Sequence, residues 1–194
     1  VVGVHLSTSY ILAGPPGVLR KQMTDYVRNQ QRVIVNTAGD PVEGDPSRPI
    51  RVVEFSDFLC PSCQKASKFT PIIVAGHRHE LSFVFKNYPL DMECNEHVKR
   101  TVHPGACQIA AAAECAHEQG KFWPFHDRVF SAGPKYKVTA ERLEADAVAA
   151  GVERGAFNEC LSSGRGMAAV KQDVAEGQRV EVGSTPTYII NGVR

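Results

Sequence analysis

Two cysteines with two residues between them, in the segment Cys60-Pro-Ser-Cys63, are the side chains best suited to covalent chemistry. An apolar run at 52–55 predicts a buried strand just before them, and Asp57 marks the turn into a helix that begins near Pro61. The first turn of a helix has unpaired N–H groups and a partial positive charge, which stabilise a thiolate. We therefore expect Cys60 to be the exposed, nucleophilic thiol. Cys63, one helical turn further on, would be the buried thiol that attacks Cys60 in a mixed disulfide.

A pair of cysteines at this spacing also occurs in zinc sites and can be structurally inert. Zinc needs further ligands, often two histidines three to five residues apart, whereas His77 and His79 are separated by one residue. The strand–turn–helix context therefore favours redox chemistry over a metal site.

A second candidate element lies at 183–192. Residues 188–190 predict a strand, and Asn191-Gly192 predicts the hairpin turn after it. Thr185-Pro186 precedes the strand. An ordinary edge-strand proline would be trans, since only a few per cent of X–Pro bonds are cis.

The order of strand, Cys-Pro-x-Cys, helix and late Thr-Pro-Thr strand resembles the thioredoxin superfamily. The resemblance implies that Pro186 is cis and packs beside the cysteines, with Thr185 facing Cys60. It narrows to the DsbA-like branch, which has a buried acid six residues before the first cysteine, here Glu54. There the acid serves as a proton shuttle for Cys63; a solvent-exposed strand end is the alternative for Glu54.

The resemblance implies an α/β protein, a thioredoxin-like fold with an inserted α-helical domain. We expect an N-terminal helix and leader loop in 1–50, the thioredoxin-like core in 51–90 and 183–194, and the helical insertion in 91–182. Segments 88–95 and 103–107 are similar to thioredoxin-like domains fused to bacterial vitamin K epoxide reductase homologues. A complete thioredoxin fold adds a strand and a helix after the turn at 191–192, so the chain either stops early or lacks them.

Periodicity and turn residues place the individual elements. Pro71 should kink or divide the helix after the cysteines, because proline removes a helical hydrogen bond. We expect helices at 18–31, 61–75, 106–119, 122–130, 139–150, 152–161 and 167–180, and strands at 33–35, 51–56, 81–85 and 188–190.

The four other cysteines allow three connectivities. We expect Cys94–Cys107, which closes a modest loop, and Cys115–Cys160, a pairing that resembles one found in some DsbA relatives. Each would stabilise the fold by roughly 2–4 kcal/mol, mainly by restricting the unfolded chain.

Two alternatives remain open for the first of these pairs. Cys94 and Cys107 together with His97 and His103 supply four side chains that zinc accepts. The same two cysteines could instead form a second redox couple that relays electrons to a partner. We expect disulfides, no bound metal and no cofactor.

Composition limits the function classes. The 194 residues carry 22 basic and 21 acidic side chains, a net charge of +1, so no nucleic-acid partner is expected. No run of 18 apolar residues is present. An even number of cysteines favours an oxidising, periplasmic or extracytoplasmic compartment. The apolar start at 1–6 fits an artificial boundary, a processed terminus or the tail of an upstream membrane tether.

These features predict an extracytoplasmic thiol–disulfide oxidoreductase that acts as an oxidant in protein folding through Cys60, Pro61, Ser62 and Cys63. Its partners would be cysteine-containing protein substrates and a membrane quinone-linked redox protein, for which a vitamin K epoxide reductase homologue is one candidate. The alternatives are a disulfide isomerase or reductase, and a non-catalytic peptide-binding module with a structural disulfide.

Overall fold

The computed structural model describes residues 16–133 and 136–194. The chain divides into two compact units, residues 1–33 with Val193 and residues 34–192 with Arg194. Within the first unit, helix α2 (Pro16–Asn29) confirms the helix expected at 18–31, whereas residues 1–6 lie outside the description. Among the described helices, none has both the length and the apolar composition needed to cross a bilayer.

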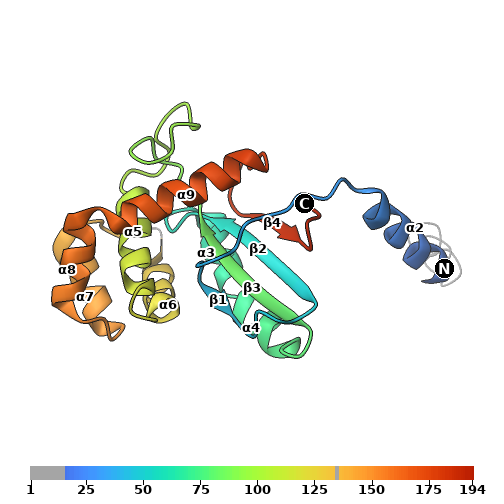
Figure 1. Cartoon of the computed structure of the whole chain (residues 1–194), viewed down its shortest axis with the longest axis horizontal. Coiled ribbons are helices and arrows are strands. Elements are labelled where there is room, and N and C mark those ends of the chain that lie inside the picture. Colours follow the sequence, from blue (N-terminus) through green and yellow to red (C-terminus); the bar gives the residue numbers. More distant parts are fainter. Residues whose placement is uncertain (1–15, 134–135) are drawn as a thin grey trace, which may run out of the picture. The chain divides into compact units, whose positions relative to one another are not determined.

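The second unit is built on a four-stranded sheet with the order β1-β3-β2-β4 (Figure 1). The two central strands, β2 and β3, run parallel, and β1 and β4 join them as antiparallel edges. Central strands of such a sheet are covered on both faces, which explains why β3 is buried throughout and β2 is buried over its last five residues, polar side chains included. The strands are β1 (Val42–Glu43), β2 (Ile50–Ser56), β3 (Leu81–Asn87) and β4 (Thr187–Ile190).

The expected strand at 33–35 is wrong. That segment is irregular, and Ile34 is 85% exposed. The edge strand forms instead at Val42–Glu43. Val42 pairs with Val84 there, and the Phe85 N–H donates to the Pro41 carbonyl. An edge strand this short is decided by its partner strand, because two residues carry no alternation of their own.

Helices α5 to α9 lie between β3 and β4 in the chain. Figure 1 shows α5, α6, α7 and α8 gathered beside the sheet, with α9 running from them toward β4. Pro71 lies in the first turn of α4, and the helix expected at 61–75 is divided there, as predicted. Thr139 caps α7 by accepting the Arg142 N–H. The helices of this unit are α3 (Pro61–Ser67), α4 (Thr70–Gly76), α5 (Ala106–His117), α6 (Phe122–Ala132), α7 (Ala140–Ala149), α8 (Arg154–Ser163) and α9 (Arg165–Arg179).

An aromatic cluster joins the sheet to the inserted helices. Phe58 packs on Phe85 and Phe130 with ring centroids 5.3 and 5.1 Å apart. Phe125 is fully buried in the same core as Cys60 and Cys63. Trp123 lies further toward the sheet edge, where its indole N–H donates to the Val42 carbonyl at 3.0 Å. Aromatic contacts of this kind add stability beyond the area that they bury.

Helix α9 approaches its neighbours closely because it carries two glycines at the points of contact. A Cβ at Gly166 would overlap the Ala111 carbonyl of α5 and would lie 2.8 Å from the Cys115 sulfur. A Cβ at Gly177 would lie 2.6 Å from the Tyr88 ring. Only glycine therefore allows α9 to lie against both α5 and the end of β3.

The structure joins Cys94 to Cys107 and Cys115 to Cys160, the pairing favoured above. The second disulfide links α5 to α8. Since the first consumes both of its thiols, neither Cys94 nor Cys107 offers the thiolate that the zinc alternative requires.

Replacing Gly166 by alanine should destabilise the protein by roughly 1–3 kcal/mol, because the added methyl group overpacks the contact between α9 and α5. Gly76→Ala is the matched control: its Cβ meets nothing within 4 Å, so stability should stay the same or rise by about 0.4–1 kcal/mol. Denaturant unfolding measures both. Equal effects of the two substitutions would contradict the close approach of α9.

Candidate active site

Cys60 and Cys63 lie at the start of α3, and both are free thiols in the structure. Cys60 is the N-cap residue and Cys63 lies inside the helix. The expectation that Cys60 is exposed is too strong: 6% of its surface is accessible, against 0% for Cys63. Cys60 is covered because the chain before β4 passes over it. It is still the more accessible thiol of the two.

Burial also sets the protonation of Cys63. Loss of solvent raises the pKa of the Cys63 thiol far above its ordinary value, and the nearby Ser56 hydroxyl and Asp57 N–H oppose this only in part. The Asp57 N–H lies 3.5 Å from the Cys63 sulfur. Cys63 is therefore a thiol at neutral pH and needs a base to become a nucleophile.

Glu54 lies on β2, buried with 3% of its surface accessible. The alternative of a solvent-exposed strand end is therefore wrong. Burial raises the pKa of Glu54 to about 7, while the hydroxyls of Ser56 and Tyr188 pull it down. The Glu54 charge in turn raises the pKa of Cys63, which places the two groups within electrostatic reach. A carboxyl with this pKa can accept or donate a proton at neutral pH.

The peptide bond between Thr185 and Pro186 is cis, as the resemblance implied. The Cys60 thiol donates to the Thr185 carbonyl with 3.4 Å between sulfur and oxygen. This contact joins residues 125 positions apart. It brings the opening of edge strand β4 directly onto the more accessible cysteine.

A crevice beside Cys60 is lined by the turn before α3 and the end of α6. The Gln64 side chain spans it by donating to the Phe130 carbonyl at 2.8 Å. Its walls are mainly apolar, and the Gln64 amide nitrogen is engaged by this hydrogen bond. The lining residues are Phe58, Leu59, Cys60, Gln64, Phe130 and Gly133.

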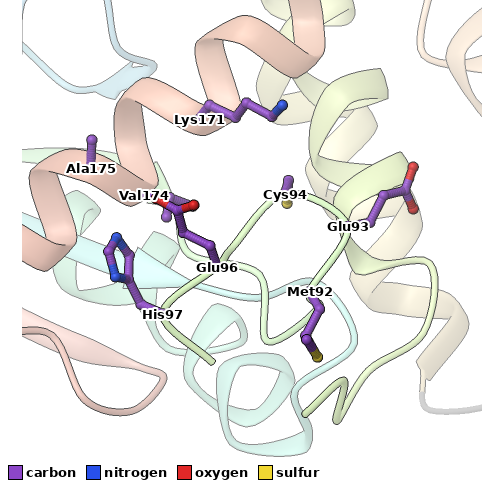
Figure 2. A pocket seen from close by; sticks show the side chains of 8 residues that line it. All are labelled: Met92, Glu93, Cys94, Glu96, His97, Lys171, Val174 and Ala175. Carbon is purple, nitrogen blue, oxygen red and sulfur yellow. The ribbon is translucent and has the colours of Figure 1, made fainter. Parts of the chain in front are cut away.

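A second hollow, of about 280 Å³, lies between α9 and the loop that follows β3 (Figure 2). It mixes acidic, basic and apolar side chains, and Cys94 of the first disulfide borders it. Among the residues that the structure describes, neither Cys60 nor Cys63 lines this hollow. Its lining is Met92, Glu93, Cys94, Glu96, His97, Lys171, Val174 and Ala175.

Asp57 and His103 also belong to this site, although their sequence positions do not predict it. The structure pairs them, with 2.8 Å between His103 Nδ1 and Asp57 Oδ2. The bond to Asp57 raises the pKa of His103. The sequence predicts a turn at Asp57 and offers His103 only as a possible zinc ligand. No local signal joins two residues 46 positions apart.

Comparison with known proteins supports the same chemistry. The model of the thioredoxin family matches residues 36–194. The structure is similar to that of oxidised BdbD from Bacillus subtilis, with a TM-score of 0.71 and 25% identity over 84% of this chain and 87% of BdbD. It is also similar to α-DsbA1 of Wolbachia pipientis, with a TM-score of 0.65 and 19% identity over 81% and 77% of the two chains.

Two curated relatives are much longer proteins. The chain is 33% identical over 167 residues to the Na(+)/H(+) antiporter NhaA 3 of Salinispora tropica. It is 29% identical over 157 residues to the antiporter NhaA 1 of Mycolicibacterium vanbaalenii. These matches cover 84% and 80% of this chain but 23% and 24% of the relatives. The chain thus spans about a quarter of their length.

Limited alkylation of the reduced protein should label Cys60 before Cys63. Cys63 has no accessible surface, and burial raises its pKa. Iodoacetamide at pH 6–7, with the labelled peptides quantified by mass spectrometry, measures the order. Labelling in denaturant is the control and should remove the difference. Faster labelling of Cys63 in the folded protein would reverse the assignment of the two thiols.

Proposed function

This chain belongs to the thioredoxin family and is a thiol–disulfide oxidoreductase, and from that premise we propose that it oxidises extracytoplasmic protein thiols through Cys60 and Cys63. One observation carries the proposal. The accessible thiol at the start of α3 faces the Thr185 carbonyl, while its buried partner lies near an acid with a pKa of about 7.

The proposed reaction starts from a Cys60–Cys63 disulfide. A substrate thiolate attacks the Cys60 sulfur, the Cys60–Cys63 bond breaks, and Cys63 leaves as a thiolate. A second substrate thiolate then attacks the substrate sulfur of the mixed disulfide and releases Cys60. Two substrate thiols become one disulfide, and their two electrons and two protons pass to the cysteine pair.

Glu54 would supply the proton that the leaving Cys63 takes up. Because burial raises the pKa of Cys63 so far, its thiolate is unstable in place and must be protonated at once. Glu54 has a pKa of about 7, so it is half protonated at neutral pH. In the reducing direction the same carboxylate would remove the Cys63 proton.

Substrate recognition is proposed to use main-chain contacts. The main chain that opens β4 would pair with an extended substrate segment, as in strand addition. Thr185 and Pro186 would hold such an extended segment over Cys60.

We also propose a membrane setting and a redox partner there. The antiporter relatives carry a stretch similar to this chain within a membrane transporter, which supports tethering of the domain to a membrane. A quinone-linked membrane protein, such as a vitamin K epoxide reductase homologue, would reoxidise Cys60 and Cys63.

Equilibration with reduced and oxidised glutathione tests the proposed function. The reduction potential should lie between the roughly −120 mV of a strong oxidant and the roughly −270 mV of thioredoxin. The reason is Ser62, an exposed neutral residue between the cysteines, which stabilises the Cys60 thiolate less than a cation would. Ser62→His should raise the potential. A potential near −270 mV would favour the reductase alternative, and a disulfide inert to glutathione would favour the binding module.

Glu54→Gln should slow reduction of the oxidised protein by dithiothreitol about 10- to 100-fold at pH 6, because Cys63 loses its proton donor. In the native protein the rate profile should bend near pH 7, where Glu54 ionises, and the variant should lack this bend. Stopped-flow mixing from pH 5.5 to 8.5 measures both. Glu80→Gln, an exposed acid on another segment, is the control. A bend that persists in Glu54→Gln would remove Glu54 from the mechanism.

A further inference from the structure

Asp57 touches both cysteines through its main chain. Its carbonyl accepts the Cys60 N–H at 3.0 Å, and its own N–H lies 3.5 Å from the Cys63 sulfur. The orientation of this single residue therefore determines where both sulfur-bearing segments lie at the end of β2.

The Asp57 side chain is held in turn by three N–H groups. Oδ1 accepts the Leu59 N–H at 2.7 Å. Oδ2 accepts the Leu90 N–H at 2.7 Å and His103 Nδ1–H at 2.8 Å. The Asp57 side chain has no exposed surface, and that of His103 is 16% exposed. A fully buried carboxylate is stable only when donors surround it, because an unpaired buried charge costs several kcal/mol of folding free energy.

His103 is fixed independently of the cysteine helix. Its N–H donates to the Leu90 carbonyl at 3.2 Å, and the Val102 N–H donates to the same oxygen at 2.8 Å. The Cys94–Cys107 disulfide closes the loop that carries it, and Asp91 accepts the Gly105 N–H at 2.9 Å. The imidazole is thus a rigid anchor for Asp57 from outside the turn.

We propose that Asp57 and His103 are a positioning pair for the cysteines, which holds the Asp57 N–H on the Cys63 sulfur and so stabilises the reduced form. A thiolate sulfur accepts a hydrogen bond more strongly than a neutral sulfur, and the Asp57 N–H thereby opposes the rise that burial causes in the pKa of Cys63. The contact therefore favours the reduced pair, in which Cys63 can ionise, over the disulfide, in which it cannot. The pair makes the protein a stronger oxidant without touching the substrate. The inference rests on the proposed exchange at Cys60 and Cys63.

Two variants test the pair. His103→Gln removes the imidazole but retains an N–H donor, and Asp57→Asn replaces one carboxylate oxygen by an amide nitrogen, which cannot accept. Each should shift the equilibrium with reduced and oxidised glutathione about 3- to 10-fold toward the disulfide form. A tenfold change corresponds to about 30 mV. In a Cys60→Ser background, His103→Gln should also speed alkylation of Cys63 by iodoacetamide, because the turn that covers it is looser.

His117→Gln is the matched control. His117 also makes a hydrogen bond to another segment, from Nε2 to the Gly39 carbonyl at 2.9 Å. Its substitution should leave the glutathione equilibrium unchanged. Thermal unfolding of the reduced and the oxidised protein distinguishes a pair that positions the cysteines from a pair that only stabilises the fold. Positioning destabilises the reduced form more than the oxidised form.

An equal loss of stability in both forms, with an unchanged glutathione equilibrium, would overturn the proposal. Should Asp57→Asn fail to fold, the His103→Gln result decides alone. Failure of the proposed function is distinguishable, because then the unsubstituted protein itself would not exchange with glutathione.

Discussion

The buried ion pair between Lys86 and Asp173 is the interaction on which the arrangement of the domain depends. It links the end of β3 to the middle of α9 with 2.8 Å between nitrogen and oxygen, and Asp40 contacts the same ammonium at 2.7 Å. Asp173 also accepts the Asn87 N–H. Removing one partner would leave a buried charge uncompensated, which typically costs about 3–5 kcal/mol. The sheet and the inserted helices are therefore joined electrostatically as well as by apolar contact.

The single positive charge of Lys86 cannot neutralise all of the carboxyl groups around it, which are those of Asp40, Asp173 and Glu114. Burial raises the pKa of Glu114 to about 8 and that of Asp40 to about 6. Glu114 is therefore mainly protonated at neutral pH, bound to the Asn87 amide. A carboxyl whose pKa is higher in the folded than in the unfolded state binds more protons when folded. For Glu114 this contribution to stability is consequently fully present below about pH 4.5, its ordinary pKa, and is lost as the pH rises to about 8.

Helix α9 connects the Lys86–Asp173 ion pair to the segment that lies over the cysteines. Lys86 and Asn87 hold its middle, Gly166 and Gly177 allow it to approach α5 and Tyr88, and the chain then turns into Thr185 and β4. The Tyr88 hydroxyl donates to the Val182 carbonyl at 2.9 Å, just before that turn. The position of the Thr185 carbonyl over Cys60 thus depends on how α9 packs against the end of β3, which lies beside the end of β2. The inserted helices are part of the support of the site.

Local patterns determined much of this protein. Helices were predictable because their hydrogen bonds join residues four apart, and the cysteine motif, Pro71 and Asn191-Gly192 act within one turn. Glu54, Thr185 and Pro186 were found through resemblance to a family, which local physics alone would not have supplied. Tertiary structure decided the rest: the edge strand at 42–43, the burial that raises the pKa of Glu54, and the bond between Asp57 and His103. These features depend on which distant segments exclude water from a polar group, and the spacing of neighbouring residues contains no such information.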